Sequence, residues 1–232
     1  MNAQLTTDDT ELLALMRQEL FSSVIGDVLD AQGFVHQFLP PAIRPLSDDM
    51  VIVGRAMPVL EADYPSEPGK VGNVALSSKA FGMMFEALDD LKRGEIYITS
   101  GVTGEYAQWG EMMSTRARAL GAAGAILNGY ARDTRGIRAM GFPTFCHGSY
   151  GQDQGVRGKV LDWRLRINIA NVTIEPGSIL FGDVDGVVVI PREAEKETLR
   201  LAFEKARGEK LVAKAIKEGM STVEAWAKFG IM

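Results

Sequence analysis

The alternation of short apolar runs with amphipathic segments between residues 95 and 146 is the feature that most constrains the fold of this chain. Three short strands are predicted at 95–99, 124–128 and 143–146, and two helices at 110–120 and 134–140. Gly121 closes the first of these helices, and Gly141 leads into the third strand. Because the connections are short, the strands are expected to form a parallel sheet with right-handed crossovers. This part of the chain therefore predicts an α/β fold.

The next part of the chain has the pattern of antiparallel strands. Residues 163–174 alternate between apolar and polar, as a half-buried strand would. Two apolar runs, 179–181 and 187–190, flank the turn 183–186, which is typical of a hairpin. An earlier alternating strand is predicted at 50–53. The second block is expected to pack on the first.

Helical patterns occupy both ends of the chain. Helices are predicted at 7–20, 22–31, 77–91 and 191–218, and an irregular segment at 64–72. Thr7 or Asp8 is the expected cap of the first helix. We interpret residues 1–232 as a single domain with N-terminal helices up to about residue 35 and a C-terminal helical extension from about residue 191.

The composition limits the available chemistry. One cysteine, Cys146, and two histidines, His36 and His147, exclude an internal disulfide and a thiolate zinc cluster. Oxygen ligands would have to hold any metal, which favours Mg²⁺ or Mn²⁺. A net charge of −5 without a Lys/Arg cluster argues against a nucleic-acid partner, and no apolar run is long enough for a membrane span. The first residues lack a signal-peptide pattern, so a cytoplasmic location is expected.

Arg132 and Asp133 follow the predicted strand 124–128 directly. Ligands bind at the carboxyl ends of parallel strands, and Gly129 would let the backbone approach one there. A guanidinium can bind a carboxylate through two hydrogen bonds, and a carboxylate is a hard metal ligand. The pair therefore suits a 2-oxo acid, which is anionic and chelates metal. A loop salt bridge, or Asp133 as cap of the next helix, is the alternative.

Glu111 lies in the first turn of the helix that follows strand 95–99. The amino end of a helix offers free amides and a positive dipole to an anion. Glu111 could contact a metal through bound water, or it could simply be a favourable partner of the helix dipole. Since the two elements follow successive strands, they are expected to be neighbours.

Other reactive side chains give weaker signals. His147 follows the third strand and could be a base near the same edge, although a structural histidine is the simpler interpretation. Lys79 and Lys92 lie in or beside polar helices, and Lys159 lies in a charged segment predicted as a loop. None of these lysines has the apolar surroundings that a Schiff-base amine requires.

Two stretches resemble a known family. They are residues 106–113, which include Trp109-Gly110-Glu111-Met112-Met113, and residues 121–133, which end in Gly129-Tyr130-Ala131-Arg132-Asp133. Both resemble the RraA-like class II pyruvate aldolases, which include 4-hydroxy-4-methyl-2-oxoglutarate aldolase and 4-carboxy-4-hydroxy-2-oxoadipate aldolase. The similarity extends over most of the chain, at 25–30, 141–145, 182–191 and 228–232.

The resemblance implies a β/β/α swivelling-type sandwich that assembles as a homotrimer or as a hexamer of two trimers. It implies that Asp133 binds Mg²⁺ or Mn²⁺ through a water-rich shell and that Glu111 orients metal-bound water. Asp27 falls in a motif that approaches the site from an adjacent subunit in that family.

The resemblance also implies how the substrate binds and reacts. Arg132 would hold the 2-oxo acid and polarise its keto oxygen, while the helix start at Gly110, with the amides of Met112 and Met113, would hold the carboxylate. The reaction would be retro-aldol cleavage of a 4-hydroxy-2-oxo acid or diacid to pyruvate. Since decarboxylation of oxaloacetate gives the same enolate, it is an expected side activity.

The chain also departs from the usual aldolase pattern. Asn128 and Ser100-Gly101 stand where many members have aspartate, and residues 149–159 differ from the usual aldolase segment. These differences concern the substrate more than the metal. Two alternatives are a non-catalytic protein, like the regulators of this family that bind RNase E, and a methyltransferase, for which no glycine-rich cofactor loop is present.

Overall fold

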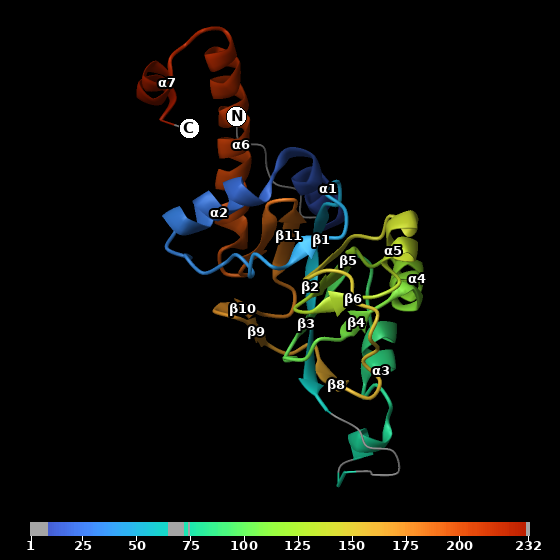
Figure 1. The fold of residues 1–232 in the computed structure, drawn as a ribbon. Helices are drawn as coiled ribbons and strands as arrows, with labels where there is room; N and C mark the ends of the chain where they lie inside the picture. Colours follow the sequence, from blue (N-terminus) through green and yellow to red (C-terminus); the bar gives the residue numbers. More distant parts are fainter. Residues whose placement is uncertain (1–8, 65–71, 74, 231–232) are drawn as a thin grey trace.

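The computed structural model describes residues 9–64, 72–73 and 75–230. The expected cap at Thr7 or Asp8 lies outside the described residues, as does most of the segment 64–72. An eight-stranded sheet forms the centre, in the order β1–β7–β5–β3–β2–β11–β12 with β8 beside β2 (Figure 1). Its strands are β1 (Arg44–Pro45), β2 (Ile52–Asp63), β3 (Glu95–Ser100), β5 (Gly124–Leu127), β7 (Thr144–Cys146), β8 (Gly158–Trp163), β11 (Ile179–Asp183) and β12 (Gly186–Ile190).

The middle of the sheet is parallel. Strands β2, β3, β5 and β7 run in one direction, and α4 (Glu111–Leu120) and α5 (Thr134–Met140) connect β3 to β5 and β5 to β7. Both helices end at a glycine in the left-handed conformation, Gly121 with φ 80° and Gly141 with φ 64°. The predicted parallel βαβαβ core is confirmed.

The second block is antiparallel, as predicted, and part of it continues the same sheet. The hairpin β11–β12 pairs Asp183 with Gly186, and β11 lies antiparallel to β2. The single strand predicted at 163–174 is wrong, because the chain turns at Arg164 (φ 58°) and Ala170 (φ 51°). These left-handed conformations are costly for residues with a Cβ, and they divide the segment into the end of β8 and a two-stranded sheet of β9 (Ile167–Ile169) and β10 (Val172–Ile174).

The predicted helix at 77–91 is also wrong. The segment instead contains a short 3-10 helix, η1 (Ala75–Ser78), and α3 (Met84–Asp89). Between them Gly82 has φ 64° and forms a bridge to Val160, and a Cβ at Gly82 would lie 2.2 Å from the Val160 oxygen. This contact with β8 replaces a continuous helix.

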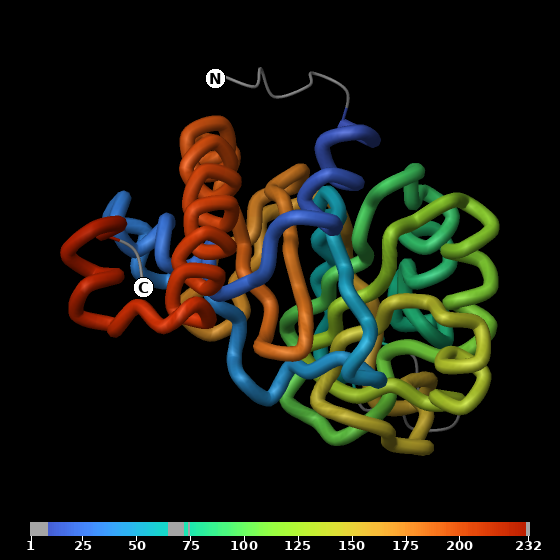
Figure 2. Tube along the Cα trace, turned by 90° about the horizontal axis from the view of Figure 1, so that it is seen from above, coloured from blue at the N-terminus to red at the C-terminus, as the bar shows by residue number. Residues whose placement is uncertain are grey.

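Helices cover the two faces of the sheet (Figures 1 and 2). One face packs on α1 (Asp9–Glu19), α2 (Ser22–Ala31) and α6 (Glu195–Lys217), and the other on α3, α4 and α5. Neighbouring strand residues alternate between the two cores, so that Ile52 and Leu180 face one core while Val53 and Phe181 face the other. The last helix, α7 (Thr222–Phe229), follows α6 away from the sheet (Figure 1). Within the described ranges, no helix has the length and apolar character needed to cross a bilayer.

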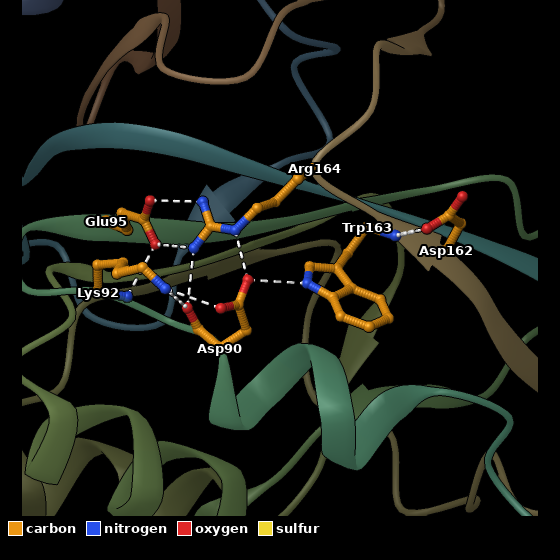
Figure 3. A network of polar contacts seen from close by, with 6 residues as sticks. All are labelled: Asp90, Lys92, Glu95, Asp162, Trp163 and Arg164. Atoms are coloured by element: carbon orange, nitrogen blue, oxygen red, sulfur yellow. Dashed lines mark hydrogen bonds and ion pairs between the residues drawn. The ribbon is translucent and has the colours of Figure 1, made fainter.

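Arg164 organises a polar network at the amino end of β3 (Figure 3). Its guanidinium donates to both carboxylate oxygens of Glu95, at 2.7 and 2.8 Å, and to the side chain and backbone oxygen of Asp90. Trp163 Nε1 also donates to Asp90, at 3.0 Å. Hydrogen bonds from Lys92 and Arg164 hold the pKa of Asp90 well below its usual range. The network fixes the end of β8 to α3 and β3, opposite the carboxyl ends of the parallel strands.

Candidate active site

A small second sheet aligns the two segments that follow β3 and β5. Strands β4 (Ala107–Trp109) and β6 (Tyr130–Ala131) pair in parallel, and the Arg132 amide donates to the Trp109 oxygen at 2.9 Å. Neither strand was predicted from the sequence. The pairing brings the start of α4 beside Asp133, since a Cβ at Gly110 would lie 3.1 Å from Asp133 Oδ2. The two elements are therefore neighbours, as expected for the ends of adjacent parallel strands.

A cleft of about 180 Å³ opens at this edge of the sheet. One part of its lining is apolar and the other is polar. The apolar side chains are Phe81, Met84, Phe85, Trp109, Met112 and Met113. The polar side chains are Gln108, Arg132, Asp133, Asp153 and Gln154. The lining also includes Ala107 and Gly110. Five lining residues were predicted as site residues from the sequence, namely Gly110, Met112, Met113, Arg132 and Asp133.

Arg132 is held between two carboxylates in the cleft. Its Nη1 lies 3.1 Å from Asp153 Oδ1, and its Nε lies 3.8 Å from Asp133 Oδ2. The second oxygen of Asp153 accepts a hydrogen bond of 3.1 Å from the Gly155 amide. The Arg132 side chain remains 40% exposed, so the guanidinium is both oriented and accessible to a ligand. Asp153 was not predicted as a site residue, and the relevant signal in the sequence is that segment 149–159 differs from the usual aldolase version.

The segment that carries Asp153 is tied to the small sheet. The Ala107 amide donates to the Gln152 oxygen at 2.7 Å, and Ala107 and Asp153 form a bridge. Earlier in the segment, the Tyr150 amide donates to the Ala131 oxygen at 2.9 Å. These backbone contacts hold the segment beside β4 and β6, and they bring Asp153 and Gln154 into the cleft lining.

Asp133 has the features of an available metal ligand. It precedes α5 in a left-handed conformation, φ 55°, and its side chain makes no capping hydrogen bond. The helix-cap interpretation is therefore not realised, and half of the side chain is exposed. The described residues contain no cluster of three or more His, Cys, Asp or Glu side chains arranged for a metal. The 3.8 Å contact with Arg132 is the loop salt bridge that the sequence left open. An exposed carboxylate with this one long contact fits Mg²⁺ or Mn²⁺ ions that keep most of their ligands as water or substrate oxygens.

The start of α4 faces the cleft, but the carboxyl group of Glu111 does not line it. Gly110 precedes the helix in an extended conformation, and the first amides of the helix have no partner within the helix itself. A Cβ at Gly136 would come 2.2 Å from Glu111 Cδ, so the carboxyl lies against the first turn of α5. This position fits the helix-dipole interpretation. The role of orienting metal-bound water stays a prediction.

Asp27 lies on α2, outside the lining of this cleft. Its Oδ2 accepts a hydrogen bond of 2.5 Å from Lys205 Nζ on α6. Within one chain the structure therefore does not bring Asp27 to Arg132 and Asp133. A contribution from an adjacent subunit stays a prediction.

A family model described as RraA-like, Aldolase/RraA, matches residues 22–189, which is more than half of the chain. The chain belongs to the RraA-like family. The match includes β2 to β12 almost completely and all the residues that line the cleft.

Similar proteins agree with this RraA-like assignment. A protein of Halalkalibacterium halodurans named "Putative 4-hydroxy-4-methyl-2-oxoglutarate aldolase" is 28% identical over 215 residues, covering 88% of this chain and 89% of that protein. The crystal structure of an uncharacterized Pseudomonas syringae protein has a TM-score of 0.82 at 22% identity and covers 99% of both chains. Streptomyces coelicolor RraAS2, described as an unusual member of the RNase ES inhibitor RraA protein family, has a TM-score of 0.76 at 19% identity, covering 89% of this chain and 98% of its own. These likenesses confirm the expected fold class.

A buried polar network supports the cleft of the RraA-like protein from behind. Gln108 Nε2 donates to Glu61 Oε2 at 3.2 Å, and Gln108 Oε1 accepts from Thr99 at 3.2 Å. Gly129 allows this arrangement, because a Cβ there would lie 2.4 Å from Gln108 Oε1. The backbone therefore approaches Gln108 at Gly129, while its approach to a ligand there stays a prediction. Burial raises the pKa of Glu61 to about 8, although the bond from Gln108 opposes this effect.

Two other candidates from the sequence lie outside the cleft lining. His147 packs edge-on against the Tyr130 ring, with the ring centroids 5.8 Å apart, and burial lowers its pKa. Lys159 is not in a charged loop as predicted, but on β8, where 2% of the residue is exposed. Its ammonium donates to the backbone oxygens of Lys79 and Ala80, and burial lowers its pKa.

Proposed function

We propose that this RraA-like protein is a divalent-metal-dependent carbon–carbon lyase that cleaves a 4-hydroxy-2-oxo acid to pyruvate by a retro-aldol reaction. The observation that carries the proposal is the meeting of the Arg132 guanidinium, the exposed Asp133 carboxylate and the amino end of α4 in one cleft. A cation, a hard oxygen ligand and unpaired amides are the groups that a 2-oxo acid needs for binding and polarisation. The aldolase name of the Halalkalibacterium relative supports the same reaction class.

In the proposed complex the substrate carboxylate lies at the start of α4. The amides of Met112 and Met113 would donate to it, and the positive end of the helix dipole would favour its charge. Arg132 would donate to the keto oxygen, while Asp153 keeps the guanidinium in place through the 3.1 Å contact. Because Asp153 fixes the guanidinium before substrate arrives, little reorganisation is needed as charge develops.

Asp133 would hold Mg²⁺ or Mn²⁺ beside the Arg132 guanidinium. When bound, the ion supplies positive charge where the keto oxygen becomes negative. The exposure of the Asp133 carboxylate supports this assignment, and so does the absence of a capping hydrogen bond from its oxygens to the amides of α5.

The proposed reaction breaks the C3–C4 bond. The C4 hydroxyl loses its proton and becomes a carbonyl, the bonding electron pair remains on C3 as the pyruvate enolate, and C3 then takes up a proton. Arg132 stabilises the enolate oxygen, and Asp153 is the chain's candidate for accepting the hydroxyl proton. Loss of carbon dioxide from oxaloacetate gives the same enolate, so this side activity belongs to the proposal.

Assembly as a homotrimer or homohexamer is also part of the proposal. Phe85 and Met112, which line the cleft, are 59% and 74% exposed. Apolar side chains with this exposure at a cleft support its coverage by a neighbouring copy. Asp27, on the exposed side of α2, is the residue expected to approach the cleft of such a neighbour.

The proposal predicts metal-dependent pyruvate release. Purified protein is incubated with a panel of 4-hydroxy-2-oxo acids and with oxaloacetate, and pyruvate is measured by coupling to lactate dehydrogenase. We expect release that falls to the enzyme-free background in excess EDTA and returns when Mg²⁺ or Mn²⁺ is added. The enzyme-free control at equal metal concentration is needed because metal ions alone decarboxylate oxaloacetate.

No pyruvate above background across the panel would remove the lyase proposal. The next hypothesis to test would then be the non-catalytic alternative, in which the protein binds an RNA-processing enzyme. None of the cleft contacts described above requires such a partner.

A further inference from the structure

Gln154 is a buried amide at the cleft whose side chain has no hydrogen-bond partner among the described residues. The residue is 2% exposed, it lines the cleft, and both its Nε2 and its Oε1 are unsatisfied. Its backbone oxygen accepts hydrogen bonds of 2.7 and 2.9 Å from the amides of Arg157 and Gly158. The turn therefore fixes this residue in place while its amide group remains unpaired. A buried amide without a partner is costly, so such a group in a cleft indicates a ligand that pairs with it.

The charges of the cleft limit what that ligand can be. Arg132 is the sole cation among the described lining residues, and its Nη1 is already 3.1 Å from Asp153. Asp133 adds a second negative charge. In the proposed complex the start of α4 takes one carboxylate, while Arg132 and the ion that Asp133 would hold serve the keto oxygen. A second carboxylate would find no further cation among the described lining residues. Burying an unpaired carboxylate is strongly unfavourable.

The remaining wall near Gln154 is apolar. Phe81 and Phe85 pack edge-on, with their ring centroids 5.7 Å apart, and Met84 lies beside them in the lining. An uncharged distal carbon chain fits such a wall, whereas a charged one would lose its hydration there. The unpaired amide offers one donor side and one acceptor side to a hydroxyl group.

We propose that Gln154 determines substrate specificity by binding a hydroxyl group on the distal end of the substrate. The preferred substrates are then 2-oxo monocarboxylic acids with an uncharged, hydroxylated distal end, and not diacids. This inference rests on the proposed retro-aldol function and names its substrate class. With 4,5-dihydroxy-2-oxopentanoate the C3–C4 bond breaks, the C4 hydroxyl proton leaves, and the enolate takes up a proton to give pyruvate and glycolaldehyde.

Three matched substrates test this inference. They share the 2-oxo acid and the C4 hydroxyl and differ in the distal group: hydroxymethyl in 4,5-dihydroxy-2-oxopentanoate, methyl in 4-hydroxy-2-oxopentanoate and carboxylate in 4-hydroxy-2-oxoglutarate. We expect kcat/KM of the wild-type protein to be at least about 10-fold higher for the hydroxymethyl substrate than for the diacid. For the Gln154→Leu variant, kcat/KM should fall about 10- to 100-fold with the hydroxymethyl substrate and change less than about 3-fold with the methyl substrate. Gln18→Leu, the same change at an exposed position of α1 outside the cleft lining, should leave all three values unchanged.

The outcomes separate this inference from the proposed function. Metal-dependent exchange of the pyruvate methyl protons reports enolate formation and needs no distal group. If exchange occurs but the wild-type protein prefers the diacid, or Gln154→Leu affects all three substrates equally, the role of Gln154 is wrong and the lyase proposal survives. If neither exchange nor pyruvate release occurs, the lyase proposal itself fails and the inference fails with it. Should Gln154→Leu not fold, the wild-type preference alone decides, because preference for the diacid contradicts the inference.

Discussion

Replacement of Arg132 by lysine is expected to lower kcat/KM for pyruvate release by at least about 100-fold. A lysine ammonium keeps the positive charge but lacks the rigid planar group that donates to the keto oxygen while also contacting Asp153. Since the Arg132 side chain is 40% exposed, its ion pair should contribute only about 0–1 kcal/mol to stability. The loss of activity should therefore occur without a large change in Tm.

The matched control is Arg135→Lys on α5, an exposed arginine three residues farther along the chain. It should retain wild-type kcat/KM in the lactate-dehydrogenase assay. Arg132→Lys with near-normal activity would show that a point charge suffices and would remove Arg132 from its proposed role.

Replacement of Glu61 by glutamine is expected to stabilise the protein at pH 8 and to have little effect near pH 4.5. Glu61 is 1% exposed, and burial raises its pKa from 4.5 to about 8. Below pH 4.5 the group is protonated in both the folded and the unfolded states, so it imposes no penalty. As the pH rises towards 8, the unfolded state loses its proton first, and the folded state loses this part of its stability. At about 1.4 kcal/mol per pKa unit, the whole interval corresponds to roughly 4 to 5 kcal/mol.

Urea unfolding at several pH values between 4.5 and 8 measures this effect as the difference between the two proteins. Glutamine keeps an oxygen that can accept the bond from Gln108, so the network behind the cleft should persist. Glu105→Gln, at an exposed position, should run parallel to the wild type over the same range. If the free energy of unfolding of Glu61→Gln also runs parallel to that of the wild type between pH 4.5 and 8, then Glu61 does not have this raised pKa.

The parallel core could be predicted because its helices and strands are each set by local patterns. The full length of β2 could not. Gly54 and Pro58 argue against a strand, yet β2 runs from Ile52 to Asp63. A Cβ at Gly54 would lie 2.5 Å from the Gly94 oxygen, so glycine is required there. Pro58 falls between the stretch of β2 that pairs with β11, which ends at Arg55, and the stretch that pairs with β8. On the other side it pairs with Ile98 of β3, but its oxygen accepts from the Arg164 amide, so its nitrogen also points away from β3.

Half of the candidate site followed from the sequence for a similar reason. Arg132 and the start of α4 come directly after predicted strands, and the ends of neighbouring parallel strands must meet. Asp153 and Gln154 come from an irregular segment without a strand or helix period. Their places depend on contacts with Ala107, forty-six positions earlier in the chain, which no local pattern reveals. For Glu111 the local pattern correctly predicted its place at the start of α4. The direction of its carboxyl group, which lies against Gly136, depends on the packing of α5 and was not predicted.

Deuterium exchange into the methyl group of pyruvate tests the central claim most directly. Release of pyruvate requires protonation of an enolate at C3, and the reverse of this step on bound pyruvate exchanges the methyl protons in D₂O. The proposed function predicts exchange, measured by proton NMR, that requires Mg²⁺ or Mn²⁺, stops in EDTA and is lost in Arg132→Lys. A folded wild-type protein that gives no exchange with either ion, or exchange that EDTA does not affect, would contradict a metal-dependent enolate site at Arg132 and Asp133.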